Sequence, residues 1–246
     1  AVTQVADKVL EVTGATSVDA GTNNVTLANA GSDFNTVAIT AGAASVTDKN
    51  AVTLDNIKAA SLALKAGGAV TQVAEKVLEV TGATTVDAGA NNVTLANAGN
   101  DFNRVAITAG AASVTDKNAV ALDNIKAASL TLKAGGAVTQ VVDKALEVTG
   151  LTSVDAGAND VTLANTNNDF GSIGVTAKAA SIVDKNAVAL DNIKAASLAV
   201  KAGGAVTQVA DKALEVTGAT TVDAGTNNVT LANANNDFGS IGVSAG

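Results

Sequence analysis

The 246-residue sequence contains no proline, cysteine, methionine, tryptophan, tyrosine or histidine, and its only aromatic residues are four phenylalanines. The absence of cysteine excludes disulfide bonds and thiolate metal sites. The absence of histidine removes the side chain that most often acts as a general base near neutral pH. With so few rings, any core must be built from small and branched aliphatic side chains.

Charged residues are also scarce, at 15 % of the chain, and their balance is acidic, with a formal net charge of −8. This charge disfavours nucleic-acid binding, because phosphate recognition needs clustered lysine and arginine. A hydrophobic content of 47 % disfavours disorder, which needs low hydrophobicity and high charge. No apolar run approaches the roughly 18 residues of a membrane-spanning helix, so we expect no membrane span.

What the sequence does contain is a tandem repeat of 68 residues. The string KAGGAVTQV occurs at residues 65–73, 133–141 and 201–209. The complete units are 1–68, 69–136 and 137–204, and a partial unit follows at 205–246. No linker and no change of composition separates the units. We therefore expect one continuous solenoid over residues 1–246 rather than separate domains.

Within each unit, apolar and polar residues alternate in short runs bounded by Gly, Asn and Asp. Runs such as NVTLANA (24–30) and TVAITA (36–41) have the period of two and the Val and Thr content of β-strands. The spacers DAGTNN, AGSD, DKN and KAGG contain residues that accept tight turns. Segments such as DNIKAASLALKAGG also fit a helical pattern, and a helical repeat is the alternative.

The repeat unit is short for a β-sandwich, and it contains one Phe where a sandwich has an aromatic core. We therefore predict an all-β fold, a parallel β-helix (β-solenoid). Each 68-residue repeat then holds about three coils of roughly 22–23 residues, and each coil contributes short strands to continuous ladders. On three whole coils, residues 68 positions apart would lie on one line along the solenoid axis.

The alternating runs also predict the interior of the solenoid. The four Phe residues share one phase of the repeat, and we interpret them as corner plugs that fill the core where a coil turns; they are Phe34, Phe102, Phe170 and Phe238. The aliphatic side chains expected to point inward are Val37, Ile39, Leu54, Leu62, Leu64, Val80 and Leu95.

Longer strings carry a resemblance to a known family. The segment NNVTLANAGNDFNRVAITAGAASVTDKNAVALDNI (91–125), with SLTLKAGGAVTQV (129–141) and LEVTGATT (78–85), resembles the repeat region of the filamentous haemagglutinin family. Members of this family are large adhesins of Gram-negative bacteria, secreted by the two-partner route. The resemblance implies a right-handed parallel β-helix, export across two membranes and a location on or outside the cell. It implies no functional residues.

The carboxylates give little support for catalysis. Some parallel β-helix enzymes cleave polysaccharides with carboxylates and a basic partner on one face, and the candidates here are Glu11 with Asp19, and Asp55 with Lys58. These groups recur in each unit, whereas a catalytic site needs one tuned set of groups. We therefore expect no enzymatic activity, no catalytic residues and no cofactor.

Two further kinds of site remain alternatives. Clusters such as NNDF (167–170) offer the oxygen ligands that Ca²⁺ prefers, but turn chemistry explains them better, and we expect no metal site. The NVT triplets at Asn24, Asn92 and Asn228 match the N-glycosylation pattern. Asn before a Val-Thr strand is also ordinary turn-to-strand sequence, and both interpretations stay open.

These observations favour a structural or adhesive stalk segment of a secreted or cell-surface bacterial protein, which supplies length and stiffness. The alternative is a subunit or segment of a self-assembling extracellular filament, sheath or matrix fibre. The expected partners are neighbouring repeats of the array or end-to-end copies of the chain. A host or neighbouring-cell surface would be contacted through regions outside this chain. A carbohydrate-binding module would need the exposed Tyr or Trp side chains that the sequence lacks.

Neither end of the sequence resembles a capping repeat. AVTQVADKVLEV (1–12) nearly repeats internal copies, and NDFGSIGVSAG (236–246) closely follows NDFGSIGVTAK (168–178). Solenoids cover the unpaired backbone of their terminal coils with atypical capping repeats. We therefore expect these residues to be a window of a longer array, or a subunit whose ends are covered by neighbouring chains.

Overall fold

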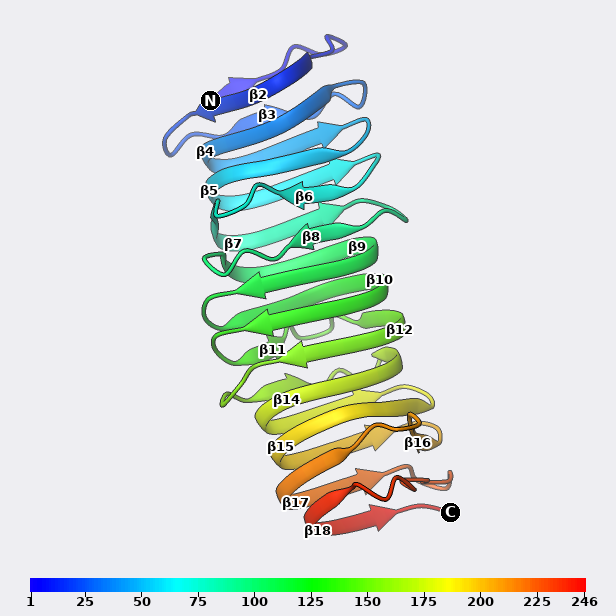
Figure 1. The fold of residues 1–246 in the computed structure, drawn as a ribbon. Coiled ribbons are helices and arrows are strands. Elements are labelled where there is room, and N and C mark those ends of the chain that lie inside the picture. Colours follow the sequence, from blue (N-terminus) through cyan, green and yellow to red (C-terminus); the bar gives the residue numbers. More distant parts are fainter. The chain divides into compact units, whose positions relative to one another are not determined.

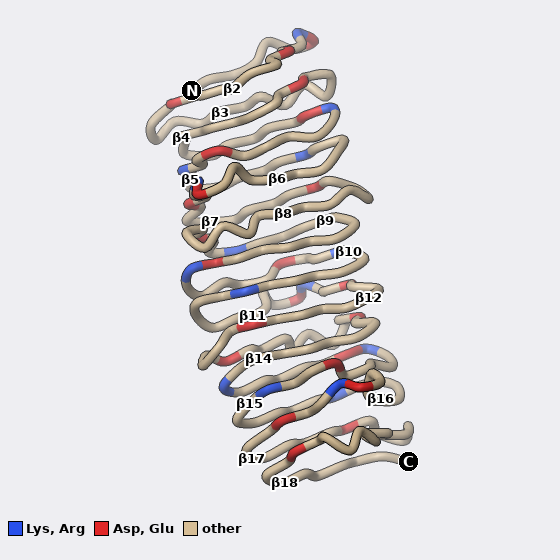
Figure 2. The backbone as a smooth tube through the Cα atoms, in the orientation of Figure 1, with Lys and Arg blue, Asp and Glu red and all other residues tan.

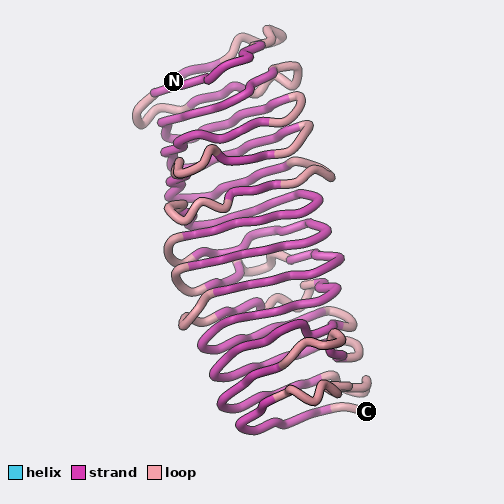
Figure 3. Tube along the Cα trace, in the orientation of Figure 1, coloured by secondary structure: helices cyan, strands magenta, loops and turns pink.

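A computed structural model describes residues 1–246, which form strands, turns and no helix (Figure 3). The chain divides into two compact units, Ala1–Lys117 and Asn118–Gly246. The division lies inside the second 68-residue repeat rather than between two repeats.

Short and long strands alternate along both units. The first unit contains β1 (Val2–Thr3), β2 (Glu11–Asp19), β3 (Val25–Leu27), β4 (Asp33–Asp48), β5 (Val52–Ala66), β6 (Val70–Gln72), β7 (Leu78–Asp87), β8 (Val93–Leu95) and β9 (Asp101–Asp116). The second unit contains β10 (Val120–Ala134), β11 (Val138–Gln140), β12 (Leu146–Asp155), β13 (Val161–Leu163), β14 (Asp169–Asp184), β15 (Val188–Ala202), β16 (Val206–Gln208), β17 (Leu214–Asp223) and β18 (Asp237–Ser244).

Within each unit the strands pair in parallel, each with the strand that passes the same side of the coil one turn later. Paired residues are 17 positions apart where the coil is shortest, at Thr36 and Thr53. They are 23 positions apart where it is longest, at Val2 and Val25. The chain is therefore an all-β, parallel β-solenoid of stacked coils, as predicted.

Each coil is flattened into two facing sheets. Residues 36–41 of β4 pair with 53–59 of β5, whereas residues 43–48 pair with 61–66. The alternation of buried side chains in β4 is interrupted at Gly42, where the strand bends from one sheet into the other. Figure 1 shows the resulting coils, with one side of each in front and the other behind.

The core between the two sheets is aliphatic, as the alternating runs predicted. All seven side chains expected to point inward are buried, with at most 3 % of their surface exposed. Phe34, Phe102 and Phe170 are fully buried, which confirms that they fill the core, while Phe238 in β18 is partly exposed.

The expectation that residues 68 positions apart lie on one line is wrong. Val37 pairs with Leu54, in the first half of β5. Its counterpart Val105 pairs with Thr84, which pairs with Leu62 in the second half of β5. Equivalent residues of the first two repeats therefore lie in opposite sheets.

The reason is that one repeat covers seven half-turns, which refines the count of about three coils to three and a half. The half-turns of one repeat are 36–41, 43–48, 52–59, 61–66, 70–80, 83–87 and 93–102. The second unit behaves in the same way. There Val161 is linked through Ala180 to Leu198 in the second half of β15, and Val229 is linked through Val206 to the first half.

The register can be tested by cross-linking, because the chain has no native cysteine. Ser45 and Ala63 are paired on adjacent coils, so their Cα atoms should be about 4.8 Å apart, within the range that a disulfide bridges. We expect the Ser45→Cys, Ala63→Cys variant to oxidise to an internal disulfide, detected by mass spectrometry after thiol alkylation. The Ser45→Cys, Thr53→Cys variant is the control. Its two sites are closer in sequence but lie in opposite sheets, and a disulfide there would contradict the two-sheet coil.

The core assignment predicts that substitutions at two adjacent positions differ strongly in their effect on stability. Leu62 is 2 % exposed, whereas its neighbour Ala63 is exposed. Leu62→Ala should destabilise its coil by about 2–5 kcal/mol, measured as faster amide exchange in β4, β5 and β7, because solenoid coils couple chiefly to their neighbours. Ala63→Thr, the residue present at Thr131 of the second repeat, should leave exchange unchanged. Equal effects of the two variants would refute the inward orientation of Leu62.

Candidate functional site: a recurring pocket between two loops

Two loops leave the sheets in every repeat, because coils of unequal length can stay paired only if surplus residues are expelled. In the second repeat, β6 pairs with residues 52–54 and the start of β7 with 57–59, so residues 73–77 form a first loop. Residues 96–100, between β8 and β9, form a second loop. The two loops lie on adjacent coils, since β8 pairs with β6 and β9 pairs with β7.

A pair of side-chain amides clamps the two loops together. The Gln72 Nε2 donates to the Lys76 carbonyl at 2.7 Å and to Asn100 Oδ1 at 2.6 Å. The Asn100 Nδ2 donates back to Gln72 Oε1 at 3.0 Å and to the Leu95 carbonyl at 3.1 Å, and the Leu78 N–H donates to Asn100 Oδ1 at 3.0 Å. Because Asn100 is fully buried, each of these bonds satisfies a group that water cannot reach.

The same clamp recurs in the other repeats. Gln140 and Asn168 form it in the third repeat, and Gln208 and Asn236 form it in the fourth. In the first repeat the partner of Gln4 is Ser32, whose hydroxyl oxygen lies 2.7 Å from Gln4 Nε2. The clamp therefore fixes the geometry of the loop pair in every repeat.

The tip of the first loop carries an acidic residue in a strained conformation. Asp7, Glu75, Asp143 and Asp211 have φ values of 60° to 63°, in the left-handed region that disfavours residues with a side chain. The only other positions with positive φ are glycines, at Gly21, Gly89, Gly157 and Gly225. The chain therefore uses glycine at one left-handed position and an acidic residue at the other.

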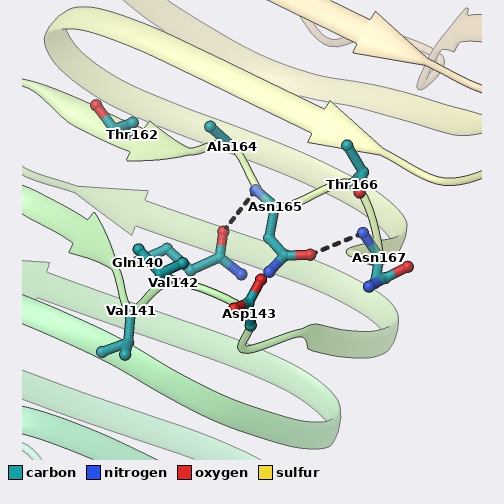
Figure 4. A pocket seen from close by; sticks show the side chains of 9 residues that line it. All are labelled: Gln140, Val141, Val142, Asp143, Thr162, Ala164, Asn165, Thr166 and Asn167. Atoms are coloured by element: carbon teal, nitrogen blue, oxygen red, sulfur yellow. Dashed lines mark hydrogen bonds between the residues drawn. The ribbon is translucent and has the colours of Figure 1, made fainter.

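A pocket lies between the two loops, and Figure 4 shows it in the third repeat. Its volume is about 320 Å³, and its lining includes Gln140, Val142, Asp143, Thr162 and Asn165. Asn165 is held by two bonds that Figure 4 draws: its N–H donates to Gln140 Oε1 at 3.1 Å, and its Oδ1 accepts from the N–H of residue 167 at 2.9 Å. Asp143, from the first loop, and Asn165, from the second, line the same pocket.

Equivalent pockets occur in two other repeats. Their volumes are about 470 Å³ in the first repeat and about 680 Å³ in the fourth. In the first two repeats the second-loop amide also bonds into the first loop: Asn29 Nδ2 donates to the Lys8 carbonyl at 3.3 Å, and Asn97 Nδ2 donates to the carbonyls of Val73 and Lys76 at 2.7 and 2.9 Å. The pocket therefore recurs along the array.

A second polar cluster lies at the turn between β14 and β15. The buried carboxylate of Asp184 accepts hydrogen bonds from the N–H groups of Phe170 and Asn186, at 2.7 and 2.8 Å, and burial raises its pKa. The neighbouring Asp169 lies 2.8 Å from Lys185 Nζ, and this hydrogen bond lowers the pKa of Asp169. The cluster joins two turns of the coil, and the carboxylates of Asp184 and Asp169 are both engaged in these bonds.

The structure separates the carboxylates that the sequence offered as catalytic candidates. Glu11 and Asp19 occupy opposite ends of β2. Asp55 forms an ion pair with Lys76 at 3.3 Å, whereas Lys58 pairs with Glu79 at 3.8 Å. No group of three or more carboxylates converges as a metal site would require. In Figure 2 the charged residues are spread along both units.

The Asn-rich segments serve as turns and clamps, as their turn interpretation predicted. In NNDF (167–170), Asn168 belongs to the clamp and Asp169 to the ion pair described above.

The asparagines of the three NVT triplets, Asn24, Asn92 and Asn228, are exposed. The first two accept bonds through Oδ1 from the next coil, from the N–H groups of Ala43 and Ala111. Glycosylation at the three positions stays a prediction.

Sequence reasoning missed both the clamp and the acidic loop tip. The signal was present, because each of the four Gln residues stands 28 positions before its Asn or Ser partner. That spacing has meaning only when the length of the coil is known.

The repeat itself defines the family. A family model described as "Repeats of unknown function (DUF5649)" matches residues 1–41, 41–109, 109–177 and 177–244. The chain belongs to this repeat family. Each internal match of the DUF5649 model begins at the alanine next to the strand bend described above. No curated protein and no solved structure matches the DUF5649 chain. The structure contains no helix long and apolar enough to cross a membrane.

The clamp predicts that two substitutions of Asn100 destabilise the repeat to different degrees. Asn100→Ala should remove the Asn100 bonds of the Leu78 N–H and the Leu95 carbonyl and two of the bonds of Gln72, at a cost of about 1–3 kcal/mol. Asn100→Ser should cost less, because Ser32 fills this position in the first repeat and stays bonded to Gln4. Amide exchange of Leu78, compared with an unaltered repeat, measures the effect. If the alanine variant is no less stable than the serine variant, the clamp does not hold the loops.

Proposed function

We propose that the chain is a stalk segment of a secreted or cell-surface repetitive protein of a Gram-negative bacterium, to which it gives length and stiffness. The observation that carries the proposal is the parallel ladder, which passes from coil to coil through each unit. Each coil repeats the same backbone pairing and the same aliphatic core. Such a structure can be lengthened by adding repeats without the design of a new interface.

The surface location and the link to adhesion rest on the resemblance to the filamentous haemagglutinin family. In that arrangement the repeats hold an adhesive region away from the cell, and the contact with a host or neighbouring cell is made outside this chain. The side chains described above support a structural role, because the clamp and the polar cluster between β14 and β15 bind parts of the solenoid to each other.

The alternative is a self-assembling extracellular filament, in which copies of the chain stack coil on coil. The parallel ladder supports it as well, because a coil offers a second copy the same backbone groups that it offers the next coil of its own chain.

The stalk proposal predicts how length depends on repeat number. Each repeat supplies three and a half coils, which at about 4.8 Å per coil extend the solenoid by about 17 Å. Arrays of four, six and eight repeats should therefore lengthen in steps of about 34 Å per two repeats, at constant width, in electron micrographs. Arrays that thicken or collapse instead of lengthening would contradict the stalk.

The location and the filament alternative have their own tests. If the chain is on the surface, an antibody to it should label intact cells of the source bacterium, with a periplasmic protein as the unlabelled control.

If copies stack, sedimentation should show a mass that rises with concentration, and Ile241→Lys should abolish the rise. A concentration-independent mass that this variant leaves unchanged excludes the filament and leaves the stalk.

A further inference from the structure

We propose that the pocket between the two loops binds a primary ammonium group on an aliphatic stem, as presented by a lysine side chain of a basic partner protein. This inference does not depend on the stalk. It rests on the acceptors in the pocket, on its apolar wall, on the strained acidic residue and on the repetition of the site.

The charge of the pocket lining suits a cation and not an anion. Asp143 is exposed and forms no ion pair, since the neighbouring Lys144 is engaged with Asp123 at 3.6 Å. The donor group of Gln140 is turned inward, to the Lys144 carbonyl and to Asn168. No lysine or arginine lines the pocket, so an ammonium group beside Asp143 would meet a carboxylate without a competing positive charge.

The remaining wall of the pocket suits the methylene stem of lysine. Val142 is 80 % exposed, and Val141 and Ala164 also line the space. A lysine side chain commonly packs its methylene groups on apolar surface while its ammonium group meets a polar partner. A sugar is a poorer candidate, because stacking on an aromatic ring is impossible here. A bare divalent ion would find one carboxylate where it needs several oxygen ligands.

The backbone at the loop tip is also unusual. Asp143 and its three counterparts occupy a left-handed conformation that Gly adopts most easily and that Asn and Asp tolerate, and the residue in every repeat is acidic. The loop is held by the Gln140–Asn168 clamp and needs no charge at its tip. A strained residue that recurs beside a cavity points to a role in binding.

The half-turn offset places these pockets on both sides of the solenoid. In the second unit, the pocket of the third repeat follows β11 and that of the fourth follows β16. These two strands belong to opposite sheets, because they are equivalent strands of successive repeats. One exposed ion pair is weak, so a single pocket should bind one lysine with low affinity.

The test is an NMR titration of the full chain with Nα-acetyl-lysine methylamide. The methyl groups of Val142 serve as the reporter, because the other repeats carry Ala at this position. We expect saturable shifts at Val142 with a millimolar dissociation constant. Nα-acetyl-norleucine methylamide, which has the same stem without the ammonium group, should cause no shift. Equal shifts with both probes, or none with the lysine probe up to 100 millimolar, would overturn the proposal.

A matched pair of variants separates the pocket from the general acidity of the chain. Asp143→Asn removes the carboxylate, and Asn accepts the left-handed conformation, so the fold should persist while binding at Val142 weakens at least five-fold. Asp160→Asn removes the same charge from a residue outside the pocket and introduces the residue that the other repeats carry there. This control should bind normally. Equal weakening by both variants would show non-specific attraction, and unchanged binding by Asp143→Asn would exclude the pocket.

Discussion

The parallel pairing of each coil with the one before it is the constraint on which the rest of the structure depends. Parallel strands share their hydrogen bonds only if the chain returns to the same place after every turn. Coils of 17 and 23 residues satisfy this condition in one solenoid because the surplus is expelled as loops. The loops are therefore the places where the repeat can present groups that the ladder does not use. The pocket lies there for this reason.

The same constraint shapes the polar interior. The amides of Gln72 and Asn100 are fully bonded, whereas the hydroxyl oxygens of Thr16, Thr84, Thr152 and Thr220 are buried without a partner. An unpaired buried hydroxyl costs about 1–3 kcal/mol, and the recurrence of this one shows that the ladder and the aliphatic core tolerate the cost in every repeat. Gly82 shows how closely the coils stack, since a Cβ there would lie 2.5 Å from the Ala60 carbonyl oxygen.

The sequence predicted what depends on local pattern and missed what depends on the path of the coil. Alternation alone placed Val37 and Leu62 in the core, and the shared phase of Phe34 and Phe102 identified them as core residues. A period of 68 residues does not fix the number of turns, because turn lengths vary with the expelled loops. The Gln72–Asn100 clamp joins adjacent coils across 28 positions, so it could not be recognised before the turns were known. For the same reason, no sequence argument could place Asp143 and Asn165 in the same pocket.

A repeat of seven half-turns gives each unit an approximate two-fold screw axis, in which an advance of one repeat is combined with a rotation of half a turn. Under this symmetry, a substitution fixed in one repeat changes one sheet, and the same substitution copied into the next repeat changes the other. Duplication of repeats therefore makes the two surfaces alike, while divergence between successive repeats makes them different. The replacement of Ala by Val142 and Leu151 in the third repeat alone is a divergence of this kind.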